Sequence, residues 1–484
     1  MASRAVNYRR AMDGERKCAM DGSCAGSRKC HCRVRSGAGI VGIRSMMRGW
    51  QTMFRISILP CLSILLLAAC GHSSGPPVAV ASVDAARSGS RAVIAAAAPV
   101  TAVVPGAGTG RLQSGVYVWQ RAWIPANASA LADSRGMFAE VRVLAAQEHP
   151  REGWIEARVD LAALAADGRA IRPVIRLDGR LPALDADAVA KRAHDLVAAW
   201  RAAGVHADGV EIDFDCPSSR LADYAKLLAA IKPRLPSDAT LSITALPTWI
   251  GAPGLADVLA QSDEAVLQVH AVSDPRHGLF DAQQAAQWIA AFAKQSAKPF
   301  RVALPAYGSA LVVDANGKTV GVESEAALDE AGERLELFSD PRDVQGLLKR
   351  LEADPPPNLR GIIWFRLPLP GDRRAWPLAT IAAVIEGNPL RSAWTPEIAD
   401  GGNGAFDISV RNSGNIEAVL PASLDVGDSG CTDADALPGY RIDRGRNALR
   451  FVRETGATLP ATQTRPLGWV RCTQLLPGDL HVHA

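Results

Sequence analysis

One segment constrains the fold of this chain more than any other. Residues 208–215 read Asp-Gly-Val-Glu-Ile-Asp-Phe-Asp. As a β-strand, this segment places three apolar side chains on one face and three carboxylates, Glu211, Asp213 and Asp215, on the other. Like charges that lie close together resist joint ionisation, so an ordinary core strand does not carry three of them. The pattern favours a barrel strand that presents acids at its carboxyl end; the alternatives are an edge strand with one solvated face or a run of helix caps.

The surrounding sequence alternates between strand-like and helix-like segments from residue 116 onward. Eight of these β-then-α units predict a (β/α)8 barrel of the TIM type over residues 114–395, with an insertion at about 309–340. From about residue 400 to 484, short alternating runs separated by turns predict a small β-rich, sandwich-like domain. The strand candidates are residues 116–123, 138–146, 170–178, 209–215, 239–247, 264–270, 300–306 and 361–367.

The N-terminal region has the features of an export signal. Residues 56–69 form an apolar run behind a basic segment, and the run ends Leu67-Ala68-Ala69-Cys70. Such a run is a secretory signal peptide, and it is too short to span a bilayer comfortably. We therefore expect residues 1–45 to be an over-extended start, residues 46–70 to be the signal, and residues 71–113 to be a flexible tether.

The Leu-Ala-Ala-Cys end of this run resembles the bacterial lipobox. The resemblance implies cleavage before Cys70, a lipid on its sulfur, and anchoring to a membrane; an ordinary signal with a chance cysteine is the alternative. Because Gly71 follows Cys70, the resemblance implies the outer membrane, with the protein facing the periplasm. An exported chain permits disulfides, so we expect Cys431 to pair with Cys472 and Cys216 to remain a free thiol.

The central segment resembles the signature of family 18 glycoside hydrolases, the chitinase-like barrels. That signature reads Asp-Gly, apolar, Asp, apolar, Asp, any, Glu at the end of the fourth strand. Residues 302–308, which end in Tyr307-Gly308, resemble the seventh strand of the family. Residues 361–365 resemble the eighth strand, in which a Trp, here Trp364, forms the bottom of the sugar-binding site. As a whole, the chain resembles the bacterial lipoprotein family called domain of unknown function 3142.

The resemblance assigns roles to individual residues and also shows departures. Asp215 occupies the position of the catalytic Glu, and it is one methylene shorter. Asp213 matches the Asp that orients the substrate N-acetyl group, Glu211 replaces an Asp deeper in the barrel, and His270 stands where the family has Tyr. Because the acid and the Tyr both differ, chitin specificity does not carry over.

Glycosidic cleavage needs a proton donor for the leaving oxygen and an anion that stabilises the developing cation. We expect Asp215 to be the donor and Asp213 the stabiliser, with Glu211 as the third catalytic carboxylate. The remaining candidates are substrate-binding residues at or near strand ends, where indole rings could stack on sugars. They are Asp178, His270, Tyr307, Trp364, Trp119 and Trp249.

The leading hypothesis is therefore a lipid-anchored glycosidase that acts on a polysaccharide or an amino-sugar glycan. A barrel with a shortened acid could instead bind a glycan without cleaving it. A third hypothesis is a metal-dependent polysaccharide hydrolase or deacetylase that uses His270 and the nearby acids, although no spacing here is typical of metal ligands. We expect no cofactor and no metal, and the net charge of +3 gives no reason to expect a nucleic-acid partner.

Overall fold

The computed structural model describes residues 111–270, 278–323, 331–427, 430–445 and 449–484. The expected over-extended start, the signal with Cys70, and the tether before residue 111 lie outside these residues. None of the helices in the described part of the chain is long and apolar enough to cross a membrane.

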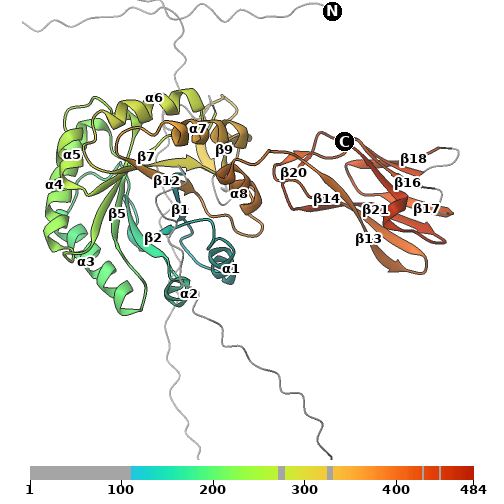
Figure 1. Ribbon diagram of the computed structural model, residues 1–484, viewed down its shortest axis with the longest axis horizontal. Helices are drawn as coiled ribbons and strands as arrows, with labels where there is room; N and C mark the ends of the chain where they lie inside the picture. The colour runs from blue at the N-terminus through green and yellow to red at the C-terminus, as the bar shows by residue number, and fades with distance from the viewer. Residues whose placement is uncertain (1–110, 271–277, 324–330, 428–429, 446–448) are drawn as a thin grey trace, which may run out of the picture. The chain divides into compact units, whose positions relative to one another are not determined.

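Eight parallel strands close into a barrel (Figure 1). The hydrogen-bonded order is β1-β12-β8-β7-β6-β5-β4-β2, and β1 also pairs with β2, which closes the ring. A short antiparallel strand, β3 (Gly153–Glu156), extends from β2. All eight expected strands are present, and the predicted (β/α)8 fold is confirmed. The barrel strands are β1 (Gln113–Val118), β2 (Glu140–His149), β4 (Ala170–Leu177), β5 (Gly209–Phe214), β6 (Thr240–Ala245), β7 (Glu264–Gln268), β8 (Phe300–Pro305) and β12 (Leu359–Phe365).

Helices cover the outside of the barrel (Figure 1). Several begin at an aspartate whose carboxylate accepts a backbone N–H of the first turn, because these N–H groups have no partner within the helix. Asp185 caps α3 in this way, Asp281 caps α6 and Asp340 caps α7. The helices are α1 (Pro125–Asp133), α2 (Leu161–Asp167), α3 (Ala186–Ala202), α4 (Leu221–Ile231), α5 (Leu255–Gln261), α6 (Ala282–Ala293), α7 (Pro341–Ala353) and α8 (Leu378–Glu386), with 3-10 turns η1 (Ser218–Arg220), η2 (Lys232–Arg234) and η3 (Pro247–Trp249).

Strand β5 shows why the alternating segment requires a barrel. Val210, Ile212 and Phe214 are fully buried against the helices. The carboxylates Glu211 and Asp213 point to the other face and are buried inside the ring of strands. Both faces are therefore buried, and the acids need partners from the other strands.

The insertion between β8 and α7 is a three-stranded antiparallel sheet with the order β10-β9-β11. Its strands are β9 (Gly308–Val313), β10 (Thr319–Glu323) and β11 (Glu333–Phe338). It begins directly after Tyr307, so the sheet follows the carboxyl end of a barrel strand, where barrel active sites form.

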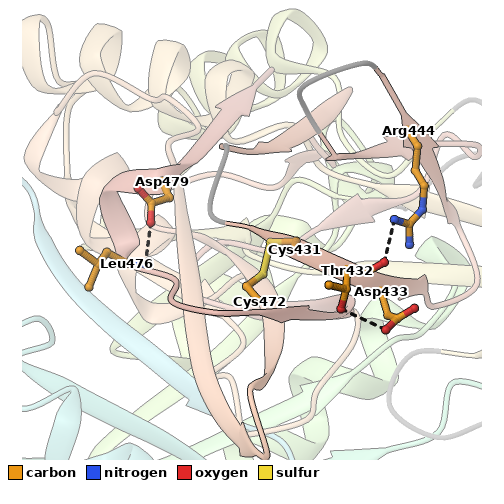
Figure 2. The surroundings of a disulfide bond; sticks show 7 residues. All are labelled: Cys431, Thr432, Asp433, Arg444, Cys472, Leu476 and Asp479. Carbon is orange, nitrogen blue, oxygen red and sulfur yellow. Dashed lines mark hydrogen bonds between the residues drawn. A yellow bond between two sulfur atoms is a disulfide. The ribbon is translucent and has the colours of Figure 1, made fainter.

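The C-terminal part is β-rich, as predicted. Two four-stranded antiparallel sheets, β13-β14-β21-β17 and β18-β19-β16-β22, enclose an apolar core of their own, and β15 pairs with β20. Figure 2 shows the disulfide that joins Cys431 to Cys472, which lie directly opposite each other on β17 and β21. The strands are β13 (Trp394–Gly402), β14 (Ala405–Asn412), β15 (Ala418–Val419), β16 (Ser423–Val426), β17 (Cys431–Ala436), β18 (Tyr440–Arg444), β19 (Leu449–Arg453), β20 (Thr458–Leu459), β21 (Thr464–Cys472) and β22 (Leu480–His483), with a 3-10 turn η5 (Pro477–Asp479).

Candidate active site

A cavity of about 290 Å³ opens at the carboxyl ends of the barrel strands. The cavity combines carboxylates, two guanidinium groups, aromatic rings and, from the insertion, aliphatic side chains. The lining residues are Tyr117, Trp119, Arg176, Asp213, Asp215, Thr244, Gln268, His270, Leu279, Ala303, Tyr307, Ser309, Leu311, Val322, Leu337, Phe365 and Arg366.

Asp213 and Asp215 reach this cavity from the end of β5. The Asp213 carboxylate is buried, with 3% of its side chain exposed, whereas the Asp215 side chain is 37% exposed. The Thr244 hydroxyl donates a hydrogen bond of 2.7 Å to Asp213 Oδ1. The two acids therefore differ in their surroundings: one is fixed inside the barrel and the other faces the opening.

Arg176, on β4, lies beside both acids. Its Nη2 is 3.4 Å from Asp215 Oδ2, and its Nε is 3.8 Å from Asp213 Oδ2. Its guanidinium also lies 5.9 Å from the centroid of the Trp119 ring, within the range of a cation–π contact. Arg176 thus offsets the negative charge of the pair and links it to the aromatic wall.

The pKa values of both acids are raised. Burial and then the charge of Asp215 raise the pKa of Asp213 to about 7, against the opposing effects of Arg176 and the Thr244 hydrogen bond. Burial raises the pKa of Asp215, Arg176 opposes this, and the charge of Asp178 adds to it. Because two adjacent carboxyls with raised pKa values do not both ionise readily, the pair retains a proton near neutral pH.

His270 and Tyr307 form the neighbouring wall of the cavity. His270 Nδ1 lies 3.3 Å from the Tyr307 hydroxyl. Burial lowers the pKa of His270 to about 4, so the ring is neutral at pH 7. Its Nε2 is buried and has no hydrogen-bond partner among the described residues. A neutral imidazole has one donor and one acceptor nitrogen, so Nε2 is available to a polar group of a bound ligand.

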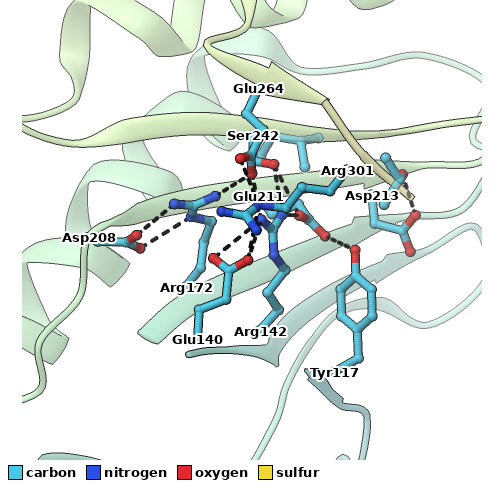
Figure 3. A network of polar contacts seen from close by, with 12 residues as sticks. Tyr117, Glu140, Arg142, Arg172, Asp208, Glu211, Asp213, Ser242, Glu264 and Arg301 are labelled. Atoms are coloured by element: carbon cyan, nitrogen blue, oxygen red, sulfur yellow. Dashed lines mark hydrogen bonds and ion pairs between the residues drawn. The ribbon is translucent and has the colours of Figure 1, made fainter. Parts of the chain in front are cut away.

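The structure corrects the expectation for Glu211, which does not line the cavity. Glu211 is fully buried among partners on other barrel strands (Figure 3). It is ion-paired with Arg142, and it accepts hydrogen bonds from the Tyr117 hydroxyl at 2.7 Å and from Ser242 Oγ at 3.1 Å. These bonds satisfy the carboxylate within the barrel, so its role is structural.

Glu211 belongs to a larger buried ion network at the amino-terminal ends of the strands (Figure 3). Burial raises the pKa of Glu264, but three guanidinium groups outweigh it and hold that pKa below its usual range. Buried charges are tolerated when each is paired and hydrogen-bonded. The members of the network are Glu140, Arg142, Arg172, Asp208, Glu211, Glu264 and Arg301.

Two of the three tryptophans expected at the sugar site lie elsewhere. Trp364 is fully buried in the core between barrel and helices, and its Nε1 is 3.2 Å from Ser114 Oγ. Its neighbour Phe365 lines the cavity instead, because adjacent strand residues point to opposite faces. Trp249 is also fully buried, and its Nε1 donates to the carbonyl oxygen of Cys216 at 2.9 Å, so it supports the segment after Asp215.

Trp119 does line the cavity, in edge contact with the Phe365 ring at a centroid distance of 5.2 Å. Asp178 does not. It forms a bidentate pair with Arg180, with N–O distances of 2.9 and 2.8 Å, and these hydrogen bonds lower its pKa to about 2. Asp178 therefore orders the loop after β4 and influences Asp215 only through its charge.

Arg176, Thr244 and Phe365 are site residues that the sequence interpretation did not assign to the site. Each occupies an inward-facing position near the carboxyl end of a predicted strand, so the alternation could have identified them once the facing of each strand was known. Gly179 also contributes, since a methyl group there would lie 1.9 Å from the carbonyl oxygen of Asp215. Only glycine permits this close approach.

Comparison with known families adds a description for both folded parts. Residues 167–370 match the family model described as Domain of unknown function (DUF3142). The barrel matches DUF3142 from β4 to β12. This DUF3142 region runs from before β4 to beyond β12, so it includes both candidate acids, and the resemblance predicted from the sequence is confirmed. Residues 398–473 match a second model, Domain of unknown function (DUF8456).

Solved structures similar to this chain include a spore cortex-lytic enzyme and chitinases. The spore cortex-lytic enzyme SleL of Bacillus cereus is 15% identical with a TM-score of 0.41, covering 59% of this chain and 76% of its own. A chitinase from Chromobacterium violaceum is 12% identical with a TM-score of 0.37, covering 53% of this chain and 95% of its own. The chitinase ChiA74 from Bacillus thuringiensis is 9% identical with a TM-score of 0.38, and the match covers 77% of this chain and 100% of the chitinase. No curated protein matches the chain.

Proposed function

We propose that this protein hydrolyses a glycosidic bond of a polysaccharide or amino-sugar glycan. The observation that carries the proposal is the pair Asp213 and Asp215, two acids with raised pKa values that line one cavity at the carboxyl ends of the barrel strands. Such acids are what general acid catalysis at neutral pH requires.

Asp215 is the proton donor in this proposal, because its side chain is the more exposed of the two. It transfers its proton to the glycosidic oxygen as the bond to the anomeric carbon breaks. Water then supplies hydroxide to that carbon and returns a proton to Asp215, so the net reaction consumes one water molecule. Asp213, held by Thr244, shares the proton that the pair retains; when Asp215 carries this proton, Asp213 provides negative charge for the cation-like transition state. Where the substrate carries an N-acetyl group, the family 18 resemblance gives Asp213 the further role of orienting it.

Glycan binding without cleavage is the second candidate function, and one observation favours it. Asp215 lies 3.4 Å from the guanidinium of Arg176, which favours the ionised form of the acid and so opposes proton donation. A metal-dependent reaction has less support, because no group of three or more His, Cys, Asp or Glu side chains in the described part of the chain could hold a metal ion.

The location of the protein is a further part of the proposal. The Leu67-Ala68-Ala69-Cys70 sequence supports lipidation at Cys70, and we propose an outer-membrane anchor that leaves the barrel in the periplasm. The intact mass of the membrane-extracted protein tests this. A mature N-terminus other than Cys70, or a Cys70→Ser protein that remains membrane-bound, contradicts it.

The decisive experiment incubates the full chain with chito-oligosaccharides, peptidoglycan and bacterial exopolysaccharides and measures new reducing ends. General acid catalysis typically contributes roughly a hundredfold or more, so Asp215→Asn should lower turnover by about that factor while glycan binding remains. The matched control is Asp195→Asn, an exposed acid on α3. Binding without turnover in the unsubstituted protein establishes the second candidate function instead.

A further inference from the structure

The three-stranded insertion has one aliphatic face. Leu311 on β9 lies directly opposite Val322 on β10 and Leu335 on β11. In antiparallel pairs, opposite residues point to the same side of the sheet. Val313 and Leu337 lie on this side as well, because they are two residues away from Leu311 and Leu335. We call these five side chains the aliphatic face.

The other face of the same sheet is buried at Ala310 and Val312 and carries a cluster of ion pairs. Glu323 lies opposite Ala310 on that face, is 3% exposed, and forms ion pairs with Arg334 and Arg374. Arg374 also pairs with Glu336. Ion pairs therefore hold the sheet on this side. On the aliphatic face, Leu311 and Leu337 pack against Leu279 and Tyr307, whereas Val322 and Leu335 are exposed.

The aliphatic face is continuous with the candidate active site. Leu311, Val322 and Leu337 line the cavity that contains Asp213 and Asp215. Beyond the cavity the face remains open, with Val322 54% and Leu335 47% exposed. From the level of Leu337 to that of Val313 the register advances four residues, which corresponds to roughly 13 Å at the usual strand rise.

Branched aliphatic side chains do not suit a sugar, whose hydroxyls require hydrogen bonds. An exposed apolar surface that extends from a binding cavity is typical of an apolar ligand group. We propose that the substrate is a glycan that carries an alkyl or acyl chain beside the reacting bond, and that this chain lies along the aliphatic face. The inference rests on the proposed function of the cavity and specifies its substrate class. The chain could be attached to the leaving oxygen or, as an acyl group, to the sugar nitrogen. Both would present the same apolar chain to the aliphatic face.

Equilibrium binding separates this inference from catalysis. The full chain carrying Asp215→Asn is held in lipid nanodiscs, and its affinity is measured for four probes: methyl and hexyl β-N-acetylglucosaminide, and the methyl glycosides of N-acetyl- and N-hexanoylglucosamine. A fully buried methylene gives roughly fourfold in affinity, and a half-buried one about twofold. The four or five added methylenes should therefore tighten binding by roughly tenfold to thirtyfold in at least one pair, and the tighter pair shows where the natural chain is attached.

A matched pair of variants locates the effect. Leu335→Ser removes an exposed side chain of the aliphatic face. Phe338→Ser removes a side chain of similar exposure, 50%, on the same strand, but Phe338 lies opposite Gly308 on the other face. The preference for the longer chain should fall at least threefold in Leu335→Ser and stay unchanged in Phe338→Ser.

Equal affinity for short and long chains, absence of binding by any probe, or a preference that survives in Leu335→Ser overturns the inference. So does a result in which Leu335→Ser only weakens the binding of a Cys70→Ser chain to phosphatidylethanolamine–phosphatidylglycerol vesicles, because the face then contacts a bilayer. Chain-length selectivity together with an unsubstituted protein that releases no reducing ends refutes only the hydrolase and keeps the binding site.

Discussion

Replacing Asp213 by Asn should make the protein more stable above neutral pH, although it removes a side chain with several contacts. Asn has nearly the same shape, and its carbonyl oxygen still accepts the Thr244 hydrogen bond. What the replacement removes is the free energy needed to ionise a buried carboxyl next to Asp215.

The size and sign of the change in stability follow from the pKa of Asp213 in the folded and unfolded states. The Asp213 carboxyl titrates at 3.8 in its ordinary state and at about 7 in the folded protein. Below pH 3.8 both states are protonated and the group has no effect. Between the two values the folded state binds more protons, so stability falls as the pH rises, and the loss is complete above about pH 7. At roughly 1.4 kcal/mol for each pKa unit the loss is at most about 4 kcal/mol; because the charge of Asp215 causes part of the shift, we expect about 2 to 4 kcal/mol.

Thermal melts of the full chain between pH 4 and pH 8 test this. Asp213→Asn should melt several degrees above the unsubstituted protein at pH 8, since 1 kcal/mol corresponds to roughly 2 °C in a large domain, and the two melting temperatures should converge near pH 4. Asp195→Asn, at an exposed position, should follow the unsubstituted protein. A lower melting temperature at pH 8, or an unchanged slope between pH 4 and pH 7, would refute the reasoning and make Asp213 a structural acid.

Three other changes have defined outcomes. Glu211→Gln removes one of the three carboxylates that pair with the buried Arg142 guanidinium. Losing a buried hydrogen bond to a charged group should destabilise the barrel by about 1.5 to 3 kcal/mol in denaturant melts; a cost below about 1 kcal/mol contradicts the structural role of Glu211. Gly179→Ala should displace Asp215 and reduce turnover at least tenfold with little change in melting temperature, and normal turnover argues against that close approach. Cys431→Ser opens a loop of 41 residues and should cost roughly 4 kcal/mol, which limited proteolysis should detect as cleavage confined to residues 394–484.

The eight barrel strands could be predicted because each is a short apolar or alternating run bounded by turn or helix signals. The carboxylates of β5 followed from the same period. The alternation placed Asp213 and Asp215 correctly on the inner face, but it gave Glu211 the same surroundings. How deep a side chain lies inside a barrel depends on the stagger of the strands and on the side chains of neighbouring strands. The sequence of one strand shows neither of these.

The different position of Trp364 and the omission of Arg176 from the predicted site have related physical causes. Alignment of a short strand to a motif can be off by one residue, and one residue exchanges the cavity for the helix-facing core, so Phe365 takes the place expected for Trp364. Arg176 lies beside Asp215 because its β4 position is opposite Asp213 of β5 in the barrel. Partners on different strands are set by register, which the sequence does not show directly.

The ion network at the amino-terminal ends of the strands also closes one end of the barrel. Its charged side chains, with the Tyr117–Glu211 contact above them, fill the barrel interior below the cavity. Because side chains fill its interior, the barrel is not a pore, and the cavity opens only at the carboxyl ends of the strands. A polymer cannot thread through the barrel. Under the proposed function, the glycan therefore lies across the mouth of the cavity, and both products of cleavage leave by the side from which the intact chain arrived.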